Sequence, residues 1–123
     1  LMSNENIEGF KMLKLPGGGL EYGEGPVECV IREFQEELDV SIEVSRLVHT
    51  TETFIPSAFK KQEQVIAIHY LVTSNDLIAS MESTQPTRLG GENYHMFEWC
   101  TLNPELLAKL TFEMDRQALI RLM

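Results

Sequence analysis

The chain has 123 residues, of which 43% are hydrophobic and 24% charged, a composition that predicts one globular domain over residues 1–123. Its formal net charge of −9 argues against binding to nucleic-acid polymers or anionic membranes, although a metal ion could bridge the protein to a small anionic ligand. No apolar run is long enough to span a bilayer, and Cys29 and Cys100 lack metal-type spacing, so we expect reduced thiols and a cytoplasmic location.

The first predicted elements in chain order are short. Ser3–Gly9 is polar and predicts a loop, whereas Phe10–Leu15 alternates partly between polar and apolar residues and predicts a strand. Pro16–Gly19 has the sequence PGGG, which forces a turn. A flexible stretch containing Gly23 and Gly25 then leads to the next element.

Pro26–Leu38 is the clearest predicted helix. Pro26 suits its first position and Gly25 is a plausible N-cap. The apolar residues recur at helical spacing and predict a stripe that faces a core: Val27, Val30, Ile31, Phe34 and Leu38. The helical period places five other residues on the opposite side: Cys29, Arg32, Glu33, Glu36 and Glu37.

The remainder of the chain predicts strands and helices joined by polar segments. We expect strands at Ile42–Phe54, Val65–Thr73 and Tyr94–Cys100, the second one covered on both faces. Ile55–Gln64 and Asn75–Gly91 are predicted to be irregular connections. Short helices are expected at Pro104–Leu110 and, capped by Thr111, at Phe112–Met123, whose apolar side is Met114, Ala118, Leu119 and Leu122. The mixture predicts an α/β or α+β fold.

The acidic end of the predicted helix is unfavourable for an isolated helix. Glu33 repels Glu36 and Glu37 at the i+3 and i+4 spacings, and all three lie near the end where the helix dipole favours cations. The simplest interpretation of these acids is a helix face that is exposed to solvent and has no functional role. A hard divalent cation would remove both penalties, because Mg²⁺ and Mn²⁺ prefer oxygen ligands.

Residues 18–40 resemble the signature of the Nudix hydrolases. The matching positions have the fixed spacing of that signature and are Gly18, Glu24, Arg32, Glu33, Phe34, Glu36, Glu37 and Val40. Asp39 departs from the pattern, since it replaces the last glycine. Leu15–Gly18, with the sequence LPGG, and Glu98-Trp99 also look like the family, so the resemblance covers most of the chain.

The resemblance implies an α/β/α sandwich on a mixed β-sheet, and only Leu1–Lys14 precede the glycine turn, so the first strand is expected to be short or missing. The implied activity is hydrolysis, dependent on Mg²⁺ or Mn²⁺, of a pyrophosphate bond in a nucleoside diphosphate linked to another group X. The partner would be a small nucleotide-type molecule, and a homodimer is possible. The alternative is a catalytically silent Nudix-fold module with a nucleotide-binding or regulatory role. The complete set of signature glutamates favours the enzyme.

The resemblance also implies roles for individual residues. Glu36 and Glu37 would bind the metal, Glu33 would be a ligand or the general base, and the carbonyl of Gly17 would be a backbone ligand. Arg32 would orient a glutamate, and Gly18 and Glu24 would support the geometry of loop and helix. Some family members recruit a base from a loop outside the signature. Glu92 is the candidate here, with a solvated loop acid as the alternative.

Other candidate residues are interpreted more plainly. His69 is expected to be a core histidine rather than a catalyst, and Asp39 is expected to adopt the left-handed conformation without binding a ligand. Selection of base, sugar and X is assigned to the loops at Ser57–Gln64 and Ser74–Gly91.

Overall fold

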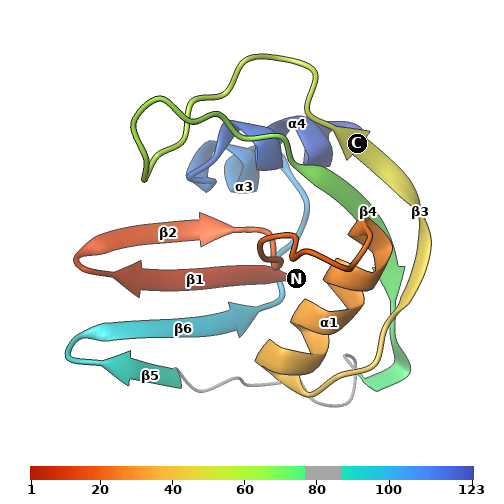
Figure 1. Cartoon of the computed structure of the whole chain (residues 1–123), viewed down its shortest axis with the longest axis horizontal. Helices are drawn as coiled ribbons and strands as arrows, with labels where there is room; N and C mark the ends of the chain where they lie inside the picture. The colour runs from red at the N-terminus through yellow and green to blue at the C-terminus, as the bar shows by residue number, and fades with distance from the viewer. Residues whose placement is uncertain (77–86) are drawn as a thin grey trace.

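The computed structural model describes residues 1–76 and 87–123 (Figure 1). Its elements in chain order are β1 (Met2–Ile7), β2 (Phe10–Lys14), α1 (Pro26–Leu38), β3 (Glu43–Thr50), β4 (Ile68–Thr73), β5 (Thr87–Gly90), β6 (Asn93–Glu98), α3 (Pro104–Lys109) and α4 (Glu113–Ile120). Within the described residues, no helix has both the length and the apolar character needed to cross a membrane.

The strands form two antiparallel sheets. Four strands pair in the order β2-β1-β6-β5, and β3 pairs with β4 in a separate two-stranded ribbon. The expected mixed sheet is corrected for the described strands, because every pairing among them is antiparallel. Short turns explain much of this: β1 reaches β2 through Glu8-Gly9, and β5 reaches β6 through Gly91-Glu92, and turns of this length can only join antiparallel strands.

The polar segment at the N-terminus is a strand, so the prediction of a loop at Ser3–Gly9 is wrong. Glu8 and Gly9 both have positive φ values, 51° and 81°, as a two-residue hairpin turn requires. That turn pairs β1 with β2, and β6 pairs with the other edge of β1. Hydrogen bonding on both edges outweighs the weak strand propensity of asparagine. Two short strands therefore precede the glycine turn.

Helices cover both faces of the four-stranded sheet. Phe97 on β6 packs with Phe34 of α1, together with Val40 and Ile42. Met2 on β1 packs with Leu106, Leu110 and Leu119 of the C-terminal helical region. Phe97 is paired with Ser3, so these two side chains point to the same face of the sheet. Met2 is the neighbour of Ser3 and therefore points to the opposite face, because successive residues of a strand alternate. The expected α/β/α arrangement is confirmed, with α1 on one face and α3 and α4 on the other.

The apolar stripe of α1 is only partly buried. Phe34 is buried, and Val30 and Leu38 pack against the same cluster. Val27 and Ile31 each remain 40% exposed. The predicted strand at Val65–Thr73 corresponds to β4. It is not covered on both faces as predicted, because Ile68 is 41% exposed. Helical period identifies a face, but the extent of its coverage depends on neighbouring elements.

The C-terminal elements differ from prediction in their bounds and caps. β5 occupies part of the segment expected to be irregular; residues 77–86 of that segment lie outside the described residues. α4 begins after Phe112, and the Thr111 hydroxyl accepts a hydrogen bond from the Leu13 N–H at 2.8 Å instead of capping the helix. This cross-connection joins the end of β2 to the start of α4.

Asp39 ends α1 in the left-handed conformation, as predicted, with φ 53° and ψ 43°. Replacing Asp39 with glycine should raise the free energy of unfolding by about 1 kcal/mol, because a Cβ is unfavourable in this conformation. The melting temperature should rise by about 4 °C in a thermal unfolding experiment. Asp39→Val is the opposing control and should lower it. A lower melting temperature for Asp39→Gly would show that the side-chain bond from Gln35 to Asp39, 2.6 Å long, matters more than the backbone.

Candidate functional site

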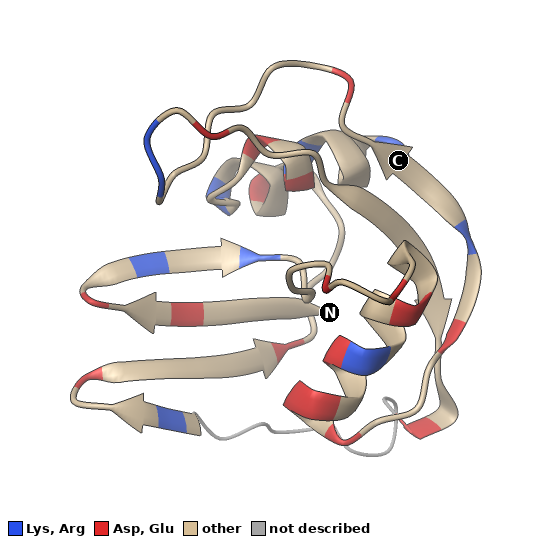
Figure 2. Cartoon of the chain, viewed as in Figure 1, with Lys and Arg blue, Asp and Glu red and all other residues tan. Residues whose placement is uncertain are grey.

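The candidate site lies where the glycine turn meets α1. Figure 2 shows the acidic residues of α1 along this helix, with one basic residue among them. Gly18 lies directly against the helix: a Cβ added there would overlap the carboxyl group of Glu33. The neighbouring Gly19 has open space at the same position. Because Gly18 has no Cβ, the glycine turn can lie directly against the Glu33 carboxyl group.

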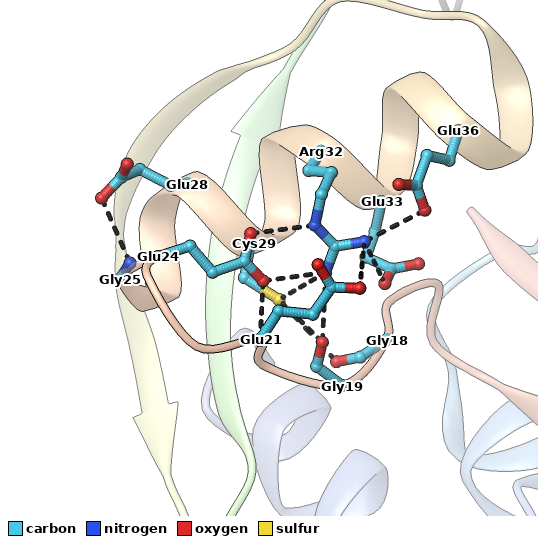
Figure 3. Close-up of polar contacts among 10 residues, drawn as sticks. All are labelled: Gly18, Gly19, Glu21, Glu24, Gly25, Glu28, Cys29, Arg32, Glu33 and Glu36. Carbon is cyan, nitrogen blue, oxygen red and sulfur yellow. Dashed lines mark hydrogen bonds and ion pairs between the residues drawn. The ribbon is translucent and has the colours of Figure 1, made fainter.

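Arg32 is the centre of a hydrogen-bond network (Figure 3). Its Nε and Nη2 atoms donate to the two carboxylate oxygens of Glu24, each at 2.8 Å. Its Nη1 atom donates at 3.0 Å to both Glu33 and Glu36. A guanidinium fork suits this bidentate contact and leaves donors for further carboxylates. Arg32 thus fixes the carboxylates of Glu33 and Glu36 relative to the loop that carries Glu24.

Arg32 also holds the far end of the glycine turn. Its Nη2 atom donates to the carbonyl oxygen of Gly19 at 3.1 Å. The buried thiol of Cys29 contacts the same carbonyl oxygen, with 3.6 Å between the sulfur and the oxygen. Cys29 lies beside Arg32, on the side of α1 opposite the apolar stripe as predicted, but it is buried there, which the sequence did not predict. Helical period places Cys29 beside Arg32, but only the folded turn covers it.

Hydrogen bonding shifts the titration of the supporting acid. The bonds from Arg32 lower the pKa of Glu24 to about 2, and a hydrogen bond from the backbone N–H of Glu21 adds to the effect. Glu24 therefore remains an anion through the neutral pH range, and the Arg32–Glu24 pair stays intact there. This supports the expected link between loop and helix.

Glu37 has the opposite shift. The pKa of Glu37 is raised to about 7, mainly by burial, against the opposing charge of Lys14 and with smaller contributions from the nearby acids Glu33, Glu5 and Glu36. Lys14 itself forms an ion pair with Glu5, with 3.3 Å between Nζ and Oε2. Sequence reasoning missed Lys14 and Glu5, which face the helix only because β1 and β2 pair. A carboxylate that is crowded and half-buried in this way would gain from a bound cation.

The Glu37 shift predicts a pH dependence for the metal-free protein. Because the pKa is higher in the folded chain than the ordinary value of 4.5, the folded state binds more protons, and the free energy of unfolding should fall as pH rises from 4.5 to 7. Thermal unfolding with a chelator across this range would measure the fall. Glu37→Gln is the control and should flatten the profile in this window. An equal fall in both proteins would contradict the assignment to Glu37.

The structure does not bring Glu92 to the acids of α1. Glu92 lies in the turn between β5 and β6, and it lines a depression of about 430 Å³ with Glu8, Gly9 and neighbouring residues of β5 and β6. Its carbonyl accepts a hydrogen bond from the side chain of Asn6. In Figure 1 this turn is at the end of the sheet opposite α1. Gly17, by contrast, is adjacent to Gly18 in the turn itself.

Within residues 1–76 and 87–123, no group of three or more His, Cys, Asp or Glu side chains is close enough together to hold a metal ion. Glu33 and Glu36 are instead engaged by Arg32. The structure places Glu33 and Glu36 of α1 within hydrogen-bond distance of Arg32, and it places Glu33 directly against Gly18 of the turn.

His69 lies inside the fold, as expected of a core histidine, but within the described residues its buried Nδ1 atom has no hydrogen-bond partner, so it is only partly satisfied. Its Nε2 atom lies 3.0 Å from Asp115 Oδ1, and its side chain is 14% exposed. Sequence reasoning missed Asp115, since an acid in the first turn of a helix is common and nothing local marks it as buried.

The NUDIX domain family model matches residues 3–122, which is nearly the whole chain. No solved structure matches the chain. The match includes the glycine turn, the Arg32 network and the acidic face of α1 described above. On this evidence the chain belongs to the NUDIX domain family.

Proposed function

We propose that this protein hydrolyses a phosphoanhydride bond in a nucleoside diphosphate linked to another group X, using a divalent metal ion. Membership of the family supports action on pyrophosphate bonds in general. The observation that carries the proposal is the contact of Glu33 with Gly18, combined with the hydrogen bonds from Arg32 to Glu24, Glu33 and Glu36. If these glutamates formed only a solvated acidic face, their side chains would not be expected to pack against the glycine turn or to be held by Arg32.

The residues fit Mg²⁺ or Mn²⁺ by their chemistry. Glu33, Glu36, Glu37 and the carbonyl of Gly17 offer only oxygen donors, which hard cations prefer. The raised pKa of Glu37 supports the fit, because its burial among other acids creates a demand for positive charge. When bound, the cation would neutralise phosphate charge and lower the pKa of water. It would also offset the repulsion between a protein of charge −9 and an anionic substrate.

The protein's own groups would then perform the proton transfer and the positioning. In the proposed reaction, water oxygen forms a bond to one phosphorus, the bridging P–O bond breaks, and the other phosphate leaves with the electron pair. Glu33 accepts the proton of the water, and Arg32 holds Glu33 in place through the 3.0 Å bond. The products are a nucleotide and a phosphorylated X, or pyrophosphate when the substrate is a nucleoside triphosphate cleaved between its α- and β-phosphates.

A substrate panel tests the proposal. ADP-ribose-type compounds, nucleoside triphosphates, dinucleoside polyphosphates and sugar nucleotides would each be incubated with Mg²⁺ or Mn²⁺, and released nucleotide, phosphate and pyrophosphate would be measured. We expect turnover of at least one class, abolished by a chelator. If no class is turned over, the alternative of a silent module that binds nucleotides takes precedence, and calorimetric titration with the same panel would test it.

A further inference from the structure

The carboxylate of Asp115 makes two buried contacts that connect three distant parts of the chain. Asp115 is 5% exposed and lies in the first turn of α4. Its Oδ2 atom accepts a hydrogen bond from the backbone N–H of Leu15 at 3.1 Å. Its Oδ1 atom contacts His69 Nε2 on β4 at 3.0 Å. A buried carboxylate is costly unless it is hydrogen-bonded in this way.

The contact to Leu15 lies at the entrance of the glycine turn. Leu15 follows β2 directly, and Pro16 after it has no N–H, so the Leu15 N–H is the last backbone donor before Gly17. Two further bonds hold the same segment to Thr111, which lies just before α4: Leu13 N–H donates to the Thr111 hydroxyl at 2.8 Å, and Thr111 N–H donates to the Leu13 carbonyl at 2.9 Å. The entrance is therefore attached to α4.

The turn is thus held at two ends. Asp115 holds its entrance, and Arg32 with Cys29 holds Gly19. Between them is Gly18, whose Cα has no free space on the side of Glu33. A shift of the entrance would move Gly18 relative to the Glu33 carboxylate.

We infer that Asp115 is a positioning residue for the hydrolytic site, acting through the Leu15 amide on the glycine turn and so on Glu33. The importance of this for turnover rests on the proposed function; the mechanical link between Asp115 and the turn does not.

Three variants separate this role from general stability. Asp115→Ala removes the acceptor for Leu15. Asp115→Asn keeps a carbonyl oxygen in nearly the same place and should rescue most of the effect. Asn103→Ala is the matched control: it removes the side-chain bond to Leu106 N–H that caps α3, 2.8 Å long, and that bond involves no residue of the glycine turn.

The first readout is the alkylation rate of Cys29 in metal-free protein, measured by mass spectrometry with Cys100 as internal reference. Cys29 is buried beneath the carbonyls of Gly18 and Gly19, so its labelling reports opening of the turn. Asp115→Ala loses the contact with His69 as well as the hydrogen bond from Leu15, and it is the loss of the Leu15 bond that should open the turn. We expect labelling about tenfold faster in Asp115→Ala, with Asp115→Asn and Asn103→Ala within about threefold of wild type. Equal rates in Asp115→Ala and wild type, or equal acceleration in Asp115→Ala and Asn103→Ala, would overturn the inference.

Amide hydrogen exchange of the wild-type protein tests the same link if Asp115→Ala does not fold. The Leu15 amide lies outside β2, yet it should be protected as strongly as the Leu13 amide. Exchange of Leu15 as fast as that of the loop residue Gly23 would overturn the inference.

The second readout is catalysis, with any substrate that the panel identifies. Asp115→Ala should lower kcat about tenfold with little change in KM, since the substrate-contacting groups remain, and Asp115→Asn should restore it. A normal kcat in folded Asp115→Ala would refute the positioning role. Failure of the proposed function would appear differently, as no turnover by wild-type protein while the Cys29 labelling difference persists.

Discussion

Replacing Gly18 with alanine should lower turnover by about 100-fold, because a displacement of about 1 Å in a catalytic group can cost that much. The new methyl group would overlap the Glu33 carboxyl group. That carboxyl is the end of a flexible side chain, so we expect Glu33 to move aside while the backbone remains folded. The measurements are steady-state kinetics, Mn²⁺ titration by calorimetry, and circular dichroism to confirm the fold. Weaker Mn²⁺ binding should accompany the lost activity.

Gly19→Ala is the matched control for this substitution. It adds the same methyl group one residue later in the same turn, where nothing lies within 4 Å of the new atom. We expect near-normal turnover and Mn²⁺ affinity. Full activity in Gly18→Ala would refute the placement of Glu33 in the site, and equal losses in both variants would show that any side chain in the turn is harmful for reasons unrelated to Glu33.

Replacing Glu36 with glutamine should lower turnover by roughly 1,000-fold, comparable to removal of a main stabilising group from an active site. Glutamine keeps the size of the side chain but loses the charge that would bind the cation. The Glu36 side chain is 58% exposed, so its replacement should leave the fold intact. Kinetics at saturating and limiting Mg²⁺, with the melting temperature of each protein, would measure both effects.

Glu28→Gln controls for the change of charge on the same helix. Glu28 accepts a hydrogen bond from the Gly25 N–H at 3.1 Å, a contact that the amide oxygen of glutamine can keep. Figure 3 shows Glu28 pointing away from Arg32, toward the start of α1. We expect nearly unchanged turnover. Near-normal activity in Glu36→Gln would remove Glu36 from the site, and an equal loss in Glu28→Gln would point to the total charge of α1 instead.

Local sequence predicted the elements whose signals are local. Gly25 and Pro26 at the start of α1 mark its N-terminus, and Asp39 adopts the left-handed conformation expected at its end. The apolar stripe predicted the burial of Phe34 but overestimated that of Val27 and Ile31. A helical period specifies which side chains share a face, and it contains no information on how much of that face a neighbour covers.

The failures are all matters of contact between distant segments. β1 is polar, and only pairing with β2 and β6 on both edges makes it a strand. Cys29 is buried only because the glycine turn lies over it. The sequence makes Glu92 a candidate base with a solvated loop acid as the alternative, and the pairing of β5 with β6 places the turn that contains it at the end of the sheet away from α1.

The sequence by itself determined the residues of the candidate site: the glycine turn, and the one arginine and three glutamates that the helical period gathers on one side of α1. These follow from short-range geometry, which the order of residues specifies directly. Only the tertiary structure decided that Gly18 meets Glu33 and that Asp115 holds Leu15, one hundred residues away along the chain. Such contacts arise when the sheet and its helices pack together, and no local pattern of residues records them.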